Sequence, residues 1–281
     1  MRLAVFPDYI SHAGKHVWQD FIESAKKDGV EIVENQLSAD AALIWSVLWH
    51  GRMRDNKQVY SFYRSENKPV IIIEVGALKR NVTWKICVNE TTSQGLYWPQ
   101  ETWSPDRKIK MLEGFNAVPR GDKILICGQN PNSHNWPKHL KVEDWIVDCV
   151  KKIRTVSDRQ IHVRPHPRFN VALPGDLGIQ TQKAKYTVRD DTDFSQVLSD
   201  YWAVVNYNSY PGIQARLHNL NTVVDATSLA SPVSHTDISK IETALAAPSD
   251  DWLDTMAHTE FYESEVKDGT AWRVIKPLLH V

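Results

Sequence analysis

Short apolar runs alternate with amphipathic segments from the N-terminus to about residue 88. Between residues 16 and 27, Val17 and Phe21 share one face of a predicted helix, and Gly29 follows it as a C-cap. A second helix is predicted over 56–65. The apolar runs are too short for helices, and we expect strands at 3–6, 30–33, 41–47, 70–74 and 84–88. Their alternation with helices indicates a parallel sheet covered on both faces.

The alternation fails between residues 97 and 121, where prolines and glycines recur, and we expect a linker there. It resumes with strands expected at 123–127, 160–163, 202–206 and 222–224, and helices expected at 142–154, 193–198 and 212–218. The tail over 250–279 has an acidic, helical pattern. The sequence therefore predicts two α/β domains, one over 1–115 and one over 116–250, with helices over 251–281 that pack back toward the first domain.

Bulk composition suits a globular protein with two buried cores. The chain has 281 residues, a net charge of −1 and 42% apolar residues, which gives no overall bias toward nucleic acid or membranes. Its three cysteines lie in apolar surroundings without metal-ligand spacing and are expected to be buried thiols: Cys87, Cys127 and Cys149. No apolar run approaches the roughly 20 residues that span a bilayer. We expect a cytoplasmic protein without a transmembrane segment.

Polar residues that follow strands are the candidates for chemistry, because ligands of open α/β sheets bind beyond the carboxyl ends of the strands. The loop after the strand at 123–127 combines a glycine, two amides and a hydroxyl, which suits contacts to an anion: Gly128, Gln129, Asn130 and Ser133. An ordinary turn is the alternative. The chain lacks the glycine pattern of dinucleotide-binding dehydrogenases and the Walker lysine of P-loop NTPases.

The segment after the strand at 160–163 holds a histidine between two prolines, with an arginine on each side. The prolines fix the backbone, so we expect His166 to project from the strand end beside Arg164 and Arg168. Guanidinium and imidazole groups together suit a diphosphate. A histidine with a purely structural role in a rigid turn is the alternative.

A predicted helix start follows the strand at 202–206. Asn208 or Ser209 would cap this helix. The N–H groups of its first turn, near Gly212, would form an anion site, and Gln214 would reach a ribose or a base. A well-capped helix that binds no ligand is the alternative.

A carboxylate in the first half is the candidate general base. Glu74 ends the most apolar strand, where partial desolvation would raise its pKa. A carboxylate paired with Lys79 or Arg80 is the alternative. Asp8 and His12, which follow the first strand, are second candidates for the base. Metal binding has no support, because no carboxylate stands at ligand spacing from the histidines of the second half.

Residues 46–85 carry eight basic residues and three acidic ones, a net charge of +5 that the acidic tail hides in the total. Aromatic residues interleave this block, which suits a phosphate polymer with stackable groups. A solvated basic face is the alternative. Contacts to an acceptor are expected from His12, Lys15, Arg52, Arg54, Lys79 and Arg80.

These blocks, in this order, resemble the capsule polysaccharide Kdo-transferase family and its GT-B relatives over roughly residues 70–225. The family's Lys-x-His-Pro block is similar to residues 164–167, and its Thr-Ser-x-x-Gly-Phe-Glu-Ala block is similar to residues 208–215. Three weaker likenesses are its Glu-Asp-Gly-Phe-Leu-Arg block, its Gly-x-Tyr-Tyr segment and its glutamine-rich loop, which match residues 74–79, 95–98 and 128–130.

The resemblance implies a GT-B-like α/β fold of two Rossmann-like domains with mostly parallel sheets and an interdomain cleft. It implies a nucleotide-sugar donor on the second domain, contacted by His166, Ser209 and Gln214, and an acceptor on the first. The chain departs from the family at Ser133, where members carry an aspartate, and at Gln214, where they carry a glutamate. The missing aspartate favours direct displacement over a covalent intermediate.

In direct displacement, Glu74 or Asp8 would deprotonate the acceptor hydroxyl, and His166 with its flanking arginines would stabilise the departing phosphate. No metal and no cofactor beyond the nucleotide-sugar is then required. The acceptor is expected to be a polymer, either a polysaccharide or hydroxymethylpyrimidine-containing DNA, because the compact chain also resembles phage-type DNA glycosyltransferases. A nucleotide-sugar-binding protein without catalysis and a phospho-polyol transferase are the alternatives.

Overall fold

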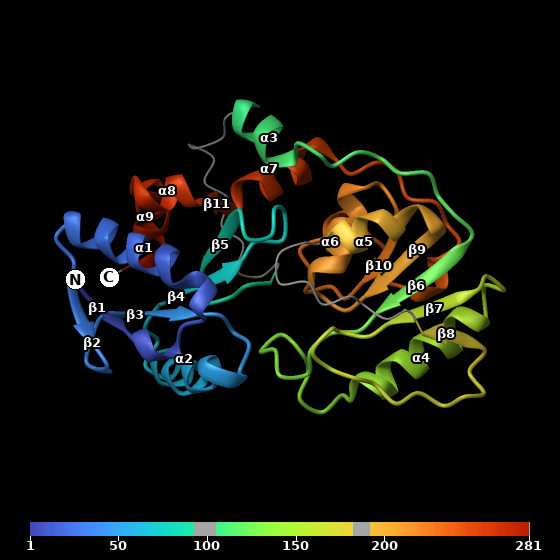
Figure 1. Cartoon of the computed structure of the whole chain (residues 1–281), viewed down its shortest axis with the longest axis horizontal. Coiled ribbons are helices and arrows are strands. Elements are labelled where there is room, and N and C mark those ends of the chain that lie inside the picture. Colours follow the sequence, from blue (N-terminus) through green and yellow to red (C-terminus); the bar gives the residue numbers. More distant parts are fainter. Residues whose placement is uncertain (93–104, 182–191, 281) are drawn as a thin grey trace. The chain divides into compact units, whose positions relative to one another are not determined.

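The computed structural model describes residues 1–92, 105–181 and 192–280 (Figure 1). The chain divides into two compact units, Met1–Met111 with Thr255–Val281, and Leu112–Asp254. The expected boundaries at 115 and 250 lie close to this division. Each unit is built on one sheet with helices on its faces, and each is described by itself below.

The first unit has a six-stranded sheet in the order β11-β5-β4-β3-β1-β2. Strands β1, β2, β3 and β4 run parallel, whereas β5 pairs antiparallel with both β4 and β11. The four parallel strands agree with the prediction of a mostly parallel sheet. The antiparallel pairing of β5 and β11 at one edge was not predicted. The strands are β1 (Arg2–Val5), β2 (Glu31–Glu34), β3 (Ala41–Trp45), β4 (Val70–Val75), β5 (Thr83–Val88) and β11 (Glu260–Tyr262).

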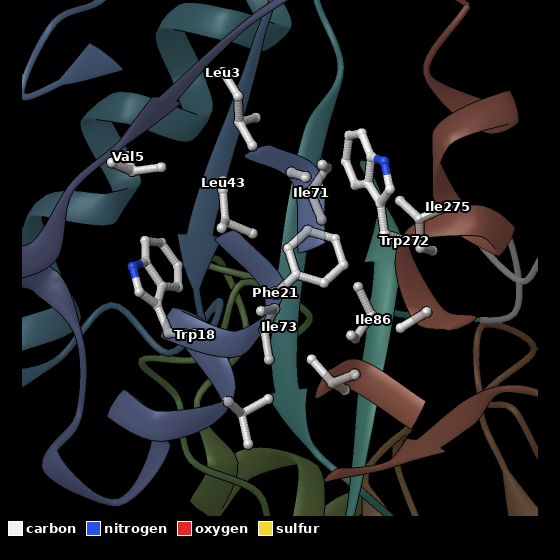
Figure 2. Packing of buried hydrophobic residues seen from close by; sticks show 14 of the residues in the cluster. Leu3, Val5, Trp18, Phe21, Leu43, Ile71, Ile73, Ile86, Trp272 and Ile275 are labelled. Atoms are coloured by element: carbon white, nitrogen blue, oxygen red, sulfur yellow. The ribbon is translucent and has the colours of Figure 1, made fainter. Parts of the chain in front are cut away.

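Alternating side chains of these strands fill two apolar cores, as a sheet covered on both faces requires. On one face, Leu3 and Ile71 pack with Phe21 of α1 and Trp272 of α9 (Figure 2). On the other face, a second cluster includes Tyr63 of α2. The helices of this unit are α1 (Lys15–Lys27), α2 (Asn56–Ser65), α8 (Glu263–Lys267) and α9 (Thr270–Ile275).

The tail is helical in pieces and contains the edge strand β11, which the sequence pattern did not indicate. The indole N–H of Trp272 donates to the Asp28 carboxylate at 2.8 Å, and Lys276 donates to the same oxygen at 2.6 Å. These bonds attach the tail to the end of α1, and they lower the pKa of Asp28.

The second unit has a five-stranded, wholly parallel sheet in the order β10-β9-β6-β7-β8. The chain leaves β6 toward β7 and β8, then returns to place β9 on the opposite side of β6. The topological switch point therefore lies between β6 and β9, where ligands of such sheets bind. The strands are β6 (Lys123–Cys127), β7 (Ile161–Arg164), β8 (Ile179–Thr181), β9 (Tyr201–Asn206) and β10 (Asn221–Val224).

Helices cover both faces of this sheet. One core cluster joins Ile124 and Ile126 to Ile146 of α4, and another joins Leu125 to Ala215 of α6. The helices are α4 (Val142–Arg154), α5 (Thr192–Val197), α6 (Tyr210–Leu217) and α7 (Asp250–His258), of which α7 crosses the division between the units.

Two further sequence expectations change in the structure. The predicted linker contains the helix α3 (Pro105–Leu112), and β8 is a strand that the sequence pattern missed. Residues 93–104 lie outside the described residues, and with them the block at 95–98. Among the residues that the structure describes, no helix is long and apolar enough to cross a membrane.

Candidate functional site

The loops after β6 and β7 lie against each other at the carboxyl edge of the second sheet. The Gly128 N–H donates to the carbonyl oxygen of Arg164 at 2.9 Å. A Cβ placed on Gly128 would lie 3.5 Å from the backbone nitrogen of His166. The predicted glycine loop and the predicted His-Pro segment are therefore neighbours.

A reciprocal amide pair bridges the switch point between β6 and β9. The Gln129 amide nitrogen donates to Asn208 Oδ1 at 2.9 Å, and the Asn208 backbone N–H donates to Gln129 Oε1 at 3.3 Å. The Asn208 amide nitrogen also donates to the Asn135 carbonyl and to the Thr227 hydroxyl. Both side chains thus hold the loops in register, and this positions the backbone around them.

A second amide, which the sequence analysis did not single out, closes the same region. Asn206 ends β9 and is 1% exposed. Its amide nitrogen donates to the Cys127 carbonyl at 3.3 Å and to the Ser209 hydroxyl at 3.0 Å, and its Oδ1 accepts the Ser209 N–H at 2.9 Å. An amide at the last position of an otherwise apolar strand was the available signal.

The start of α6 differs in detail from the expected cap. Ser209 is the N-cap residue, but its side chain makes no capping bond to the helix. The first turn instead packs closely on the sheet, because a Cβ on Gly212 would lie 2.9 Å from Val224 Cγ1. Gln214 is 3% exposed and lies within the buried run of α6. The prediction that it contacts a ribose or a base called for a more open position.

A tight turn after β7 presents the histidine. The Phe169 N–H donates to the His166 carbonyl at 2.9 Å, and the Arg168 N–H donates to the His166 Nδ1 at 3.1 Å. The Arg164 guanidinium lies 5.3 Å from the Phe194 ring centroid. His166 and Arg164 are partly buried, whereas Arg168 is exposed.

The remaining residues predicted to bind the nucleotide-sugar shape the loop after β6. Asn130 is buried, and its Oδ1 accepts the Asn132 N–H at 2.9 Å. The Ser133 hydroxyl accepts the Asn135 N–H at 3.3 Å. At the next strand end, the Asp225 carboxylate accepts from the Thr227 hydroxyl at 2.6 Å. The loops after β6, β7 and β9 therefore meet at one sheet edge, with backbone N–H groups, a histidine and arginines that suit an anion, whereas Gln214 is enclosed in α6.

The first unit holds Glu74 at the carboxyl end of β4. Its Oε1 accepts from the Val47 N–H at 2.7 Å and from the Ser46 hydroxyl at 2.9 Å. Burial raises the pKa of Glu74, although both hydrogen bonds oppose the shift. Ser46 has a φ of 66°, a left-handed conformation that is unusual for serine and costly outside functional sites.

Other predicted residues of the first unit lie on neighbouring segments. Asp8 is in a short 3-10 turn after β1, His12 begins a second 3-10 turn, and Lys15 begins α1; all three are exposed. Asn56 donates to the Tyr9 and Trp45 carbonyls, at 3.1 and 2.6 Å, and so ties the loops after β1 and β3 together. Asp8 and Glu74 therefore lie on the same edge of the first sheet.

Four residues of the basic block lie in the loops after β3 and β4, at the carboxyl edge of that sheet, and one lies at the amino edge. Arg52 and Arg54 are exposed in a 3-10 helix after β3, and Arg54 is 3.2 Å from Asp55. Lys79 donates to the Lys110 carbonyl, and Arg80 is exposed in the same loop after β4. In contrast, Lys68 donates to the Ala39 carbonyl, just before β3, at the amino edge. Lys68 therefore does not share a surface with the basic residues of the carboxyl edge.

A buried carboxylate outside the predicted set organises the loop after Glu74. Glu260 of β11 is 0% exposed. Its carboxylate accepts the Ala77 N–H at 2.5 Å, the Leu78 N–H at 3.1 Å and the Thr83 hydroxyl at 2.6 Å. No local sequence pattern marks this residue, because its partners lie more than 170 positions away. Among the residues that the structure describes, no group of three or more histidine, cysteine or acidic residues is placed to hold a metal ion.

No family model and no curated protein matches the chain by sequence. Solved structures do match over nearly the whole chain. The KpsC beta Kdo 2,4 transferase of Thermosulfurimonas dismutans is similar at a TM-score of 0.55 and 12% identity, over 93% of this chain and 92% of that one. The KpsC beta Kdo 2,7 transferase of the same organism is similar at 0.50 and 13%, over 97% and 100%. The chain therefore has the GT-B fold, with two Rossmann-like α/β units.

Proposed function

We propose that the chain is a GT-B glycosyltransferase that moves a sugar from a nucleotide-sugar to a hydroxyl group of an acceptor. The observation that carries the proposal is the convergence of Gly128, His166 and Ser209 at the switch point of the second sheet. Parallel sheets bind ligands at this position. The likeness to two Kdo transferases extends over nearly the whole chain and supports the GT-B fold on which the proposal rests.

The second unit supplies groups that neutralise a leaving phosphate. When the acceptor oxygen attacks the anomeric carbon, the bond from that carbon to the phosphate oxygen breaks, and its electron pair stays on the phosphate. In this proposal Arg164, Arg168 and the His166 ring, at the end of β7 and in the turn after it, give the diphosphate cationic and N–H contacts. These groups take up the negative charge, so the proposed reaction needs no metal ion.

The first unit supplies the base. Glu74 accepts the proton of the acceptor hydroxyl in this proposal, and its raised pKa brings it closer to the working pH of a general base. Asp8 is the second candidate, because it follows β1 on the same edge. A direct displacement inverts the anomeric configuration, which product NMR reads out.

A polysaccharide is the favoured acceptor. Two of the eight basic residues that suggested a phosphate polymer, Lys68 and Lys79, donate to backbone carbonyls, and Lys68 lies at the sheet edge opposite to Arg52 and Arg54. A DNA duplex would require these charges on one surface. Binding of hydroxymethylcytosine-containing DNA at low salt, weakened steeply by added salt, would revive the DNA acceptor.

The proposal is tested by screening nucleotide-sugars for a thermal shift and then analysing acceptors by mass with the best donor. A ligand at about 100 times its Kd adds about 2.7 kcal/mol of stability. His166→Ala should abolish most of the transfer, whereas His139→Ala, at an exposed histidine outside the cluster, should not. Transfer that persists in EDTA supports independence from metal.

Three results would replace the proposal. Binding of a nucleotide-sugar without release of nucleotide, with every acceptor tried, indicates a sensor. A product whose added mass is that of a phospho-polyol indicates a phospho-polyol transferase. The absence of any nucleotide or nucleotide-sugar binding contradicts the proposal itself.

A further inference from the structure

The turn after β7 fixes more than the position of the histidine. His166, Pro167, Arg168 and Phe169 form a β-turn, closed by the Phe169 N–H on the His166 carbonyl at 2.9 Å. Proline favours the second position of such a turn because its ring presets φ. The N–H of the third residue then points back at the first side chain, as it does in turns that begin with aspartate or asparagine.

In this turn the Arg168 N–H donates to the His166 Nδ1 at 3.1 Å. A backbone amide can only donate, so Nδ1 must be the accepting nitrogen. A neutral imidazole has one protonated nitrogen, and the bond that one nitrogen makes sets the state of the other. The proton of the neutral ring is therefore on Nε2.

We propose that the backbone of Arg168 locks His166 in the Nε2–H form, so that the ring serves the proposed donor site as a neutral hydrogen-bond donor. The inference rests on the proposed function for its ligand, a phosphate oxygen of the nucleotide-sugar. It excludes His166 as a general base at Nε2, and it leaves proton abstraction to the carboxylates of the first unit. A neutral N–H group can bind an anion without first being protonated, so this contact does not require acidic pH.

The tautomer is tested without any ligand. Long-range ¹H–¹⁵N spectra of the labelled protein, at a pH that keeps the ring neutral, should show a protonated Nε2 and an unprotonated Nδ1. A coupling across the hydrogen bond, from the Arg168 nitrogen to the His166 Nδ1, should be detectable. A protonated Nδ1, or a rapidly averaged ring, would overturn the inference whatever the protein binds.

The donor role is tested by substitutions that mimic one ring nitrogen at a time. The amide nitrogen of His166→Gln lies near the position of Nε2, whereas that of His166→Asn lies near Nδ1. With a panel of UDP, GDP, TDP, CMP and inorganic pyrophosphate, the glutamine variant should bind within about threefold of the native protein, while the asparagine and alanine variants lose about tenfold or more. Arg168→Ala keeps the backbone N–H and should retain the ring state while weakening anion binding.

The two failures are distinguishable. If the native protein binds none of the five compounds and no nucleotide-sugar, the proposed function fails, and the ring spectra still decide the tautomer. If it binds one of them and the glutamine variant is as weak as the alanine variant, the Nε2–H donor role is wrong.

Discussion

Replacing Glu260 tests the packing of the first unit directly, because this single buried carboxylate anchors the loop between β4 and β5. In Glu260→Ala the N–H groups of Ala77 and Leu78 and the hydroxyl of Thr83 lose their shared acceptor. Hydrogen bonds to a charged group are worth about 1.5–3 kcal/mol each, but the loop relaxes and water enters. We therefore expect a total loss of about 3–5 kcal/mol, because three buried donors are left without an acceptor.

Urea unfolding followed by tryptophan fluorescence measures this loss, and amide hydrogen exchange at residues 77 and 78 locates it. Glu260→Gln keeps one accepting oxygen and should lose about 1–3 kcal/mol. Glu263→Gln is the matched control, since Glu263 is half-exposed and pairs with His16 at 3.3 Å; its change should stay within about 0.5 kcal/mol. A loss below about 1 kcal/mol in Glu260→Ala would refute the anchoring role of this carboxylate.

Three further perturbations test other parts of the structure. Burial raises the pKa of Glu74 above 4.5, so the folded state holds the proton longer and the stability of the native protein falls as the pH rises above that value. Glu74→Gln lacks this titration, so its stability relative to the native protein should increase as the pH rises above 4.5, and a pH-independent difference in urea midpoints would contradict this. Gly212→Ala should lose about 1–3 kcal/mol by thermal unfolding, since its Cβ would lie 2.9 Å from Val224, whereas Gly128→Ala, with its nearest atom at 3.5 Å, should be tolerated; equal effects would show that α6 can shift. Arg216 is 1% exposed and donates to two backbone carbonyls at 2.6 and 2.7 Å, so Arg216→Met should cost about 2–4 kcal/mol in urea unfolding, and an unchanged midpoint would show that these carbonyls find other donors.

Local patterns predicted the regular elements well where each element buries its own apolar residues. The helix over 56–65 and the strand over 123–127 have the predicted bounds, because their periodicity and flanking residues are local. Strand β11 was missed, since its three residues become a strand only by pairing with β5, far away in the chain. The helix α3 was missed because prolines and glycines on both sides dominate its segment.

The candidate site was predictable to the level of strand ends. The rule that ligands bind at the carboxyl edge of parallel strands was enough to select the glycine loop and the His-Pro turn together. The pattern did not reveal which amides bind each other. Gln129 and Asn208 were predicted as ligand contacts, and their mutual hydrogen bonds show in addition that they set the register between two loops. Glu260 escaped prediction because tertiary contacts alone give it its role, whereas Asn206 carried a local signal, an amide that ends an apolar strand, that was not used.

Mapping a bound nucleotide onto the backbone amides of the second unit tests the central claim most directly. Titration of ¹⁵N-labelled protein with the best nucleotide of the panel should shift most strongly the backbone amides of residues 128–130, 166, 168, 169, 209, 210, 212 and 213. Shifts confined to other residues of the second unit, or to the first unit, would contradict the claim that the strand ends around β6 hold the phosphates.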